Sequence, residues 1–156
     1  MSENILSIHE NWMAEAIRLA ELAYRNGEIP IGAIVIKDRK IIGRGYNQRE
    51  KLKDPTAHAE IIAISAAANT LGDWRLNDCT LYVTKEPCAM CTGALVNARI
   101  SSIVFGCYDA DNGYCGSVAD LCNSPQKKNT VSIRGGINEK RCLDLVQNFF
   151  KNRRKA

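Results

Sequence analysis

The chain has 156 residues, of which 46% are hydrophobic and 24% charged, with a formal net charge of +4. This size and balance are typical of one folded domain, spanning residues 1–156. The opening stretch MSENILSIHENWMAEA is charged and lacks an apolar run, and no later stretch approaches the length of a membrane span. These features exclude a standard secretory signal and a membrane protein, so we expect a cytoplasmic protein with no membrane partner.

The first half of the chain predicts two helices that flank a hairpin. Hydrophobic residues recur at helical spacing from Trp12 to Tyr24, and Gly27 follows as a stop. The remaining expected elements are strands over 29–36 and 41–47 joined by a turn at 37–40, a polar loop over 48–56, and an alanine-rich helix over 57–71 closed by Gly72.

The second half continues the alternation of strands and helices. Pro87 suits the first turn of a helix, and Leu143, Val146, Phe149 and Phe150 recur on one side of the last one. The expected elements are a strand over 80–84, a helix over 86–98, a strand over 101–106, a loop-rich segment over 107–130 with room for a short helix at 117–122, a strand or loop over 131–136, and a basic C-terminal helix at about 138–156. Alternating elements favour an α/β sandwich around one sheet.

Charge is concentrated at the C-terminal end. Residues 1–124 carry 12 basic and 15 acidic side chains, whereas residues 125–156 carry 9 basic and 2 acidic ones. Such a segment indicates either a polyanionic partner or a solvated terminal helix, and charge alone does not separate the two.

The seven cysteines are an odd number in a chain with no sign of export. In a reducing compartment they are better interpreted as thiols or metal ligands than as a disulfide framework. Cys79, Cys122 and Cys142 lie among apolar residues, and we expect them to be core thiols.

Two short stretches, DPTAHAE and KEPCAMC, contain a candidate zinc site. Cys88 and Cys91 are three residues apart at an expected helix start, so both sulfurs emerge from one turn, where the helix dipole favours thiolates. His58 lies at another expected helix start, with Glu60 two residues on. Two helix starts that converge would supply three ligands of the kind that zinc prefers.

The number of ligands decides the kind of zinc site. Structural sites are closed by four protein ligands, whereas catalytic sites leave one position for water. His9 has no partner motif, and we expect a structural or surface role for it. Cys107 and Cys115 could in principle close the site, but their loop shows no recognisable pairing. Three ligands and a water are the preferred interpretation.

Each stretch alone is a weak signal. A CxxC pair fits a redox dithiol, half of a structural zinc site or chance, and HxE is weaker still. Together they form H-x-E…P-C-x-x-C, the signature of zinc-dependent deaminases. Zinc lowers the pKa of its water toward about 7. Glu60 could then accept that proton and deliver it to a ring nitrogen and a departing amine. A dithiol would leave His58 and Glu60 without a role.

Longer stretches resemble a known family. GEIPIGAIVI, GYN, DPTAHAEIIAI, WRLNDCTLYVTKEPCAMCTGALVNARISSIVFG and DADNGYCGS are together similar to bacterial tRNA adenosine deaminases, in order from Trp12 to Phe150. The resemblance implies a cytidine-deaminase-like fold, a three-layer α/β/α sandwich with a mixed five-stranded sheet, and a homodimer. It also implies conversion of adenosine to inosine at the wobble position of a tRNA anticodon, usually in an arginine tRNA.

The resemblance also assigns roles to individual residues. His58, Cys88 and Cys91 match the ligands of one zinc ion per chain, and Glu60 matches the proton shuttle. The matched substrate positions are Asn47 as a base contact, the Ala59 backbone facing the flipped base, Ile31 as an apolar wall, Glu86 and Pro87 as a lip around the metal, and Asp109 beside the target nucleotide. Without the resemblance, Asn47 would fit a turn residue at a strand end.

The basic end fits an RNA substrate. Phe149 and Phe150 could stack on bases, although one of two adjacent phenylalanines is expected in the core. Lys151, Arg153 and Arg154 could contact phosphates of a tRNA anticodon stem-loop. One departure is QKKNTV, with Lys128 and Asn129 where relatives tend to carry Asn-His, so an expected RNA-facing histidine is absent.

Two alternatives remain at this point. A free nucleobase or nucleoside deaminase of the guanine or cytosine type would share the zinc site, but it would not need the basic end, and VFGCYDADNGYCGS is less similar to those families. A non-catalytic zinc or thiol module would not need Glu60.

Overall fold

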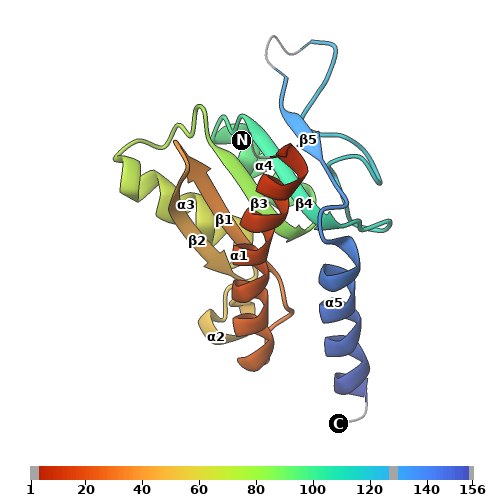
Figure 1. Ribbon diagram of the computed structural model, residues 1–156. Helices are drawn as coiled ribbons and strands as arrows, with labels where there is room; N and C mark the ends of the chain where they lie inside the picture. The colour runs from red at the N-terminus through yellow and green to blue at the C-terminus, as the bar shows by residue number, and fades with distance from the viewer. Residues whose placement is uncertain (1–3, 127–129, 155–156) are drawn as a thin grey trace.

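Five strands form one mixed sheet at the centre of the molecule (Figure 1). The computed structural model describes residues 4–126 and 130–154. Its elements in chain order are α1 (Ile5–Arg25), β1 (Gly32–Lys37), β2 (Lys40–Tyr46), α2 (Arg49–Leu52), α3 (Ala59–Leu71), β3 (Thr80–Lys85), α4 (Ala89–Asn97), β4 (Ser102–Cys107), β5 (Ser132–Arg134) and α5 (Glu139–Arg154).

The strand order is β2-β1-β3-β4-β5. β1 pairs antiparallel with both β2 and β3, whereas β3, β4 and β5 run parallel. The predicted mixed five-stranded sheet is therefore confirmed. β5, which the sequence left open as strand or loop, is a short edge strand paired with β4.

Helices cover both faces of this sheet. Side chains alternate along a strand, so neighbouring residues enter different layers. Val35 and Val83 belong to a core that includes Ala63 of α3 and Leu95 of α4. On the other face, the core packs strand residues against α1 and α5 and contains Met13, Ile17, Ile34, Tyr82, Val104 and Cys142. The predicted three-layer α/β/α sandwich is confirmed, with α1 in front of the sheet in Figure 1.

Helix α3 lies unusually close to β2. A Cβ atom at Gly43 would lie 2.3 Å from the carbonyl oxygen of Ala63, and one at Gly45 would lie 2.3 Å from that of Ala59. Small residues on both sides allow this approach, since Ala59, Ala63 and Ala67 are all fully buried. The contact fixes the beginning of α3 relative to the sheet, which matters because His58 precedes it.

Two local predictions were wrong. Residues 117–122 form turns and an isolated bridge between Cys115 and Asp120, because the Asp120 side chain accepts from the backbone amide of Cys122 and so favours a turn. The expected polar loop contains the short helix α2. The first helix begins at Ile5, where the Asn4 side chain accepts from the amide of Leu6.

Helix α5 occupies the position of the expected basic C-terminal helix and buries a narrower face than expected. Val146 and Phe149 are buried together with Cys142, whereas Leu143 and Phe150 are 37% and 40% exposed. Lys128 and Asn129 lie outside the described residues. Across the parts of the chain that are described, no helix is long and apolar enough to cross a membrane.

Replacing Gly43 by alanine should destabilise the fold by about 1–3 kcal/mol, because the new methyl group meets backbone rather than a movable side chain. Urea unfolding of the purified variants measures this. Gly93→Ala is the matched control: nothing lies within 4 Å of that position on α4, so alanine should be neutral or stabilising by up to about 1 kcal/mol. Equal stability of the two variants would contradict the packing described.

Candidate active site

The candidate site lies at one edge of the sheet, where β2, β3 and β4 end. β1 begins at the same edge, since Gly32 pairs with Tyr46 at the end of β2. Lys85 at the end of β3 pairs with Cys107 at the end of β4. Residues that directly follow or precede these strand ends therefore face a common space. In α/β proteins this edge is the usual place for a ligand site.

A tight turn leads into α3. The Asp54 carboxylate accepts from the amide and the hydroxyl of Thr56, at 2.8 and 2.7 Å, and the Ala57 amide donates to the Asp54 carbonyl. This turn brings His58 to the N-cap of α3 in an extended conformation. The stretch DPTAHAE therefore folds as a turn and helix start that present an imidazole at the sheet edge.

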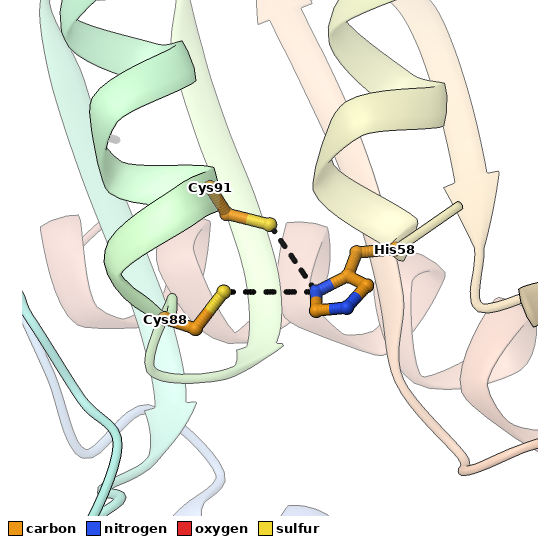
Figure 2. A group of neighbouring side chains, drawn as sticks. All are labelled: His58, Cys88 and Cys91. Atoms are coloured by element: carbon orange, nitrogen blue, oxygen red, sulfur yellow. Dashed lines mark hydrogen bonds between the residues drawn. The ribbon is translucent and has the colours of Figure 1, made fainter. Parts of the chain in front are cut away.

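Helix α4 begins in the same region. Cys88 is its N-cap, with extended backbone, and Cys91 lies in its first turn. Pro87 precedes the cap, so its predicted place in the first helical turn was wrong; its carbonyl instead accepts from the amide of Tyr114. The two sulfurs face His58 across the gap between α3 and α4 (Figure 2).

The spacing of the three side chains fits a zinc ion. Nδ1 of His58 lies 3.6 Å from Sγ of Cys88 and 3.4 Å from Sγ of Cys91, and all three ligand atoms lie within 4.8 Å of one another. Tetrahedral zinc with nitrogen at about 2.0–2.1 Å and sulfur at about 2.3 Å separates those atoms by about 3.6 Å. One imidazole and two thiols are also the ligand types that zinc prefers.

Local electrostatics favour the metal-binding form of Cys88. The hydrogen bond from Cys91 lowers the pKa of the Cys88 thiol to about 4, and the hydrogen bond to His58 adds to this. The same Cys88 contact and burial raise the pKa of Cys91. The hydrogen bond to Cys88 raises the pKa of His58. One thiolate is thus already favoured at neutral pH, and zinc would displace the second proton.

The cluster has three ligands among the residues that the structure describes. Cys107 belongs to the core on the α1 face of the sheet, and Cys115 contacts the hydroxyl of Thr92, so neither closes the site. His9 lies within α1 and bonds to the Tyr82 hydroxyl at 2.8 Å. A tetrahedral zinc held by these three ligands would keep a fourth position for water, as in catalytic zinc sites.

Glu60 lies beside the cluster with only 4% of its surface exposed. Burial is the main cause that raises the pKa of its carboxyl group to about 7, and the Cys91 thiol hydrogen-bonds to it. A carboxyl group whose pKa lies near neutrality can both accept and donate protons at physiological pH.

A cavity of about 410 Å³ opens above Glu60. It is lined by Ile29, Ile31, Asn47, Arg49, His58, Ala59, Glu60, Lys85, Glu86, Cys88, Asp109, Asn112 and Phe150. The structure thus brings together most of the residues that the sequence pointed to. Sequence analysis missed Ile29, Arg49, Lys85 and Asn112. Arg49 and Lys85 stand beside GYN and EPC, but adjacency to a motif does not show which way a side chain points.

Asn47 is 4% exposed, and hydrogen bonds fix both its backbone and its side chain. Its amide N–H donates to the carbonyl of Ile31 at 3.1 Å, and its side-chain oxygen accepts from the amide of Arg49 at 3.3 Å. The side-chain NH₂ group remains as a donor for the cavity that it lines.

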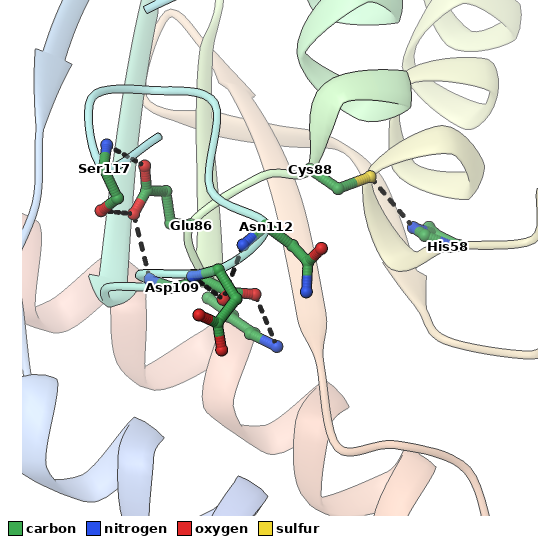
Figure 3. Close-up of polar contacts among 8 residues, drawn as sticks. His58, Glu86, Cys88, Asp109, Asn112 and Ser117 are labelled. Carbon is green, nitrogen blue, oxygen red and sulfur yellow. Dashed lines mark hydrogen bonds and ion pairs between the residues drawn. The ribbon is translucent and has the colours of Figure 1, made fainter. Parts of the chain in front are cut away.

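Glu86 organises the loop that forms the opposite wall. Its carboxylate accepts from the amides of Asp109 at 3.0 Å, Cys115 at 3.2 Å and Ser117 at 3.0 Å, and also from the Ser117 hydroxyl (Figure 3). A Cβ atom at Gly113 would lie 2.3 Å from the Glu86 carboxyl carbon, so this loop wraps tightly around the carboxylate. Glu86 therefore acts on the cavity mainly by holding its wall.

The C-terminal residues divide between core and cavity. Phe149 packs edge-on against Tyr24 and is 5% exposed, whereas Phe150 lines the cavity. Arg153 stacks over the Phe149 ring, and Lys151 is exposed. The Arg154 side chain lies outside the described residues.

Comparisons with known proteins agree with this geometry. The family model of the MafB19-like deaminases matches residues 7–154. A tRNA-specific adenosine deaminase of Bacillus subtilis (strain 168) is 40% identical, over 94% of this chain and 91% of that protein. One from Buchnera aphidicola subsp. Schizaphis graminum is 42% identical, over 92% and 94%.

Solved structures show the same relationship. A structure from a study of A-to-I editing by tRNA:A34 deaminases superposes with a TM-score of 0.82 at 35% identity, covering 86% of this chain and 98% of that chain. A guanine deaminase from Nitrosomonas europaea superposes with a TM-score of 0.73 at 23% identity, covering 90% and 83%, and shares the fold.

Fold and site together define a deaminase of the cytidine-deaminase-like class, with a His-Cys-Cys cluster suited to a metal ion beside its cavity. Within that class, the chain belongs to the family of tRNA-specific adenosine deaminases.

Cys88→Ala should lose most bound zinc, because two protein ligands do not hold the ion as tightly as three. Metal analysis after dialysis measures zinc per chain, with about one expected in the parent protein. Cys142→Ala is the control, since that thiol is buried against the other face of the sheet. Full zinc content in the Cys88 variant would refute the ligand assignment.

Proposed function

We propose that this enzyme deaminates adenosine to inosine by zinc-dependent hydrolysis at the wobble position of a tRNA anticodon, in an arginine tRNA. The observation that carries the proposal is a three-ligand cluster, open at its fourth position, beside the buried Glu60 at the base of a cavity. The names of the bacterial relatives supply the substrate class.

The chain's own residues divide the chemistry among them. His58, Cys88 and Cys91 would hold one zinc ion, which supplies Lewis acidity that lowers the pKa of a water toward about 7. Glu60 accepts the proton of the attacking water. It delivers that proton to the ring nitrogen N1. It then accepts the second proton from the new hydroxyl group on the ring carbon and passes it to the departing amine, so that ammonia leaves and a carbonyl replaces the amine.

The cavity walls would orient the base. Ile29 and Ile31 offer apolar contacts to the ring faces, and the NH₂ group of Asn47 can donate to a ring nitrogen. Ala59 lines the same cavity at the start of α3, and its backbone would face the base. A volume of about 410 Å³ exceeds what a base alone would fill, which favours a nucleotide with its sugar.

The remainder of an anticodon stem-loop would extend over the mouth. Bases in an RNA loop are accessible and can be splayed into a pocket. Phe150 stands at the cavity with an exposed ring, and the exposed Lys151 and Arg153 follow it on α5. Glu86 and Pro87 would shape the lip beside the metal, and Asp109 would lie beside the target nucleotide.

We further propose that residues 1–156 act as one deaminase domain, that the protein is cytoplasmic, and that it forms a homodimer. The bacterial relatives support the first two points, because they are named for action on tRNA and align with this chain over most of their own length. Trp74 and Met90 supply exposed apolar surface near α3 and α4 for contact between copies.

Glu60→Ala should retain zinc and bind tRNA but lose about 10²–10⁴-fold in turnover, because the ligands remain and only the proton carrier is removed. Inosine formed in purified tRNA per unit time is the measurement. Glu10→Ala, an exposed carboxylate on α1, should keep parental activity. Turnover within a few-fold of the parent after Glu60→Ala would exclude this role.

Phe150→Ala should weaken binding of an anticodon stem-loop by about 1–3 kcal/mol, the usual value for loss of one stacked base. Fluorescence anisotropy with labelled RNA measures it. Leu143→Ala provides the matched control, because Leu143 is also partly exposed on α5 but is absent from the cavity. The two variants binding alike would mean that Phe150 makes no stacking contact.

A further inference from the structure

One ion pair within the cavity wall has no role in the chemistry above. Nζ of Lys85 lies 3.0 Å from Oδ2 of Asp109, with side chains 25% and 14% exposed. Among the ion pairs found in the described segments, the other side chains are 34–90% exposed. Both members line the cavity. A pair so shielded from water is more strongly coupled than an ordinary surface pair.

Asp109 is fixed from several sides. Its Oδ1 accepts from the amides of Asp111 at 3.1 Å and Asn112 at 3.0 Å, which closes a turn, and its own amide donates to Glu86. Figure 3 shows Asp109 between Glu86 and Asn112. Lys85 adds the contact from strand β3 and takes the remaining oxygen. The ion pair therefore ties the loop after β4 to the end of a central strand.

The Lys85–Asp109 ion pair also changes the charge that the cavity wall presents to a substrate. The cavity is lined by the acidic residues Glu60, Glu86 and Asp109, and the Asp109 carboxylate also accepts from the amide of Asn112, another lining residue. Hydrogen bonds from Lys85 and from backbone amides lower the pKa of Asp109 against the opposing effect of burial, so it is ionised at neutral pH. An uncompensated carboxylate there would repel a polyanion, and Lys85 cancels that charge.

We propose that Lys85 is a positioning residue for substrate recognition: its ammonium group holds the Asp109 carboxylate and neutralises it, so that Asp109 and Asn112 present a fixed, uncharged wall to the sugar–phosphate backbone of an RNA. This inference rests on the proposed function for the nature of the substrate. Lys85 itself acts through Asp109 and makes no phosphate contact.

A double-mutant cycle tests this directly. The zinc-loaded parent, Lys85→Met, Asp109→Asn and the double variant are compared for kcat and KM on a synthetic anticodon stem-loop at several salt concentrations. Lys85→Met should raise KM about tenfold, the effect of losing one charge-assisted hydrogen bond, with kcat within about threefold. Lys85→Arg should restore most of the loss. On the Asp109→Asn background, the same Lys85→Met change should alter KM by less than about twofold, because the group through which it acts is gone.

Two results would overturn the inference. In the first, Lys85→Met raises KM as much on the Asp109→Asn background as in the parent, and the slope of log KM against log salt concentration falls by about one. Lys85 would then contact a phosphate itself. If kcat, zinc content and thermal midpoint fall together while KM holds, the pair merely supports the fold.

A second measurement needs no RNA and separates this inference from the proposed function. Hydrogen exchange of the Asp111 and Asn112 amides should quicken about tenfold in Lys85→Met and stay near parental in Lys85→Arg, because both amides donate to the carboxylate that Lys85 holds. Unchanged exchange would show that the Lys85–Asp109 ion pair does not hold this loop. Faster exchange in a protein that edits no RNA would confirm that the ion pair holds the loop but would contradict the proposed RNA substrate.

Discussion

One metal ion needs three donor atoms within bonding reach, and here two helices must supply them. His58 stands at the start of α3, and Cys88 and Cys91 stand at the start of α4. The two helices contact each other, and both share one core with the strands of the sheet. Helix α3 is set by backbone contact with the glycines of β2, and α4 follows β3 after only three residues. The separations of 3.4 and 3.6 Å depend on this packing.

The geometry of the sheet also shapes the cavity. Because β3 and β4 are parallel and end together, the segments after them lie side by side above the cluster. The carboxylate of Glu86, at the end of β3, gathers the amides of the loop that follows β4. This end of the sheet therefore has the His-Cys-Cys cluster beside the cavity, an apolar wall from residues before β1, and a polar wall that is held by the buried carboxylate of Glu86.

Much of this could be predicted from the sequence. The three ligands could be predicted from their spacing, since cysteines three apart at a helix start share one turn. Zinc also prefers the sulfur and imidazole ligands that Cys88, Cys91 and His58 provide. The alternation of elements and the family resemblance predicted the sandwich, which is confirmed. The turn at 117–122 was missed because an aspartate side chain and an isolated bridge override apolar spacing. Lys85 was missed because its partner is 24 positions away and only the parallel pairing of β3 and β4 brings them together.

We propose that the buried Glu60 and the three-ligand cluster act on a base within a tRNA rather than on a free base. The most direct measurement is incubation of the zinc-loaded protein with total tRNA from a strain lacking this activity, followed by sequencing, in which inosine is read as guanosine. We expect A-to-G changes at the wobble position of an arginine tRNA, with free adenosine, guanine and cytosine left nearly untouched. Rapid deamination of a free base, with the tRNA unedited, would contradict it.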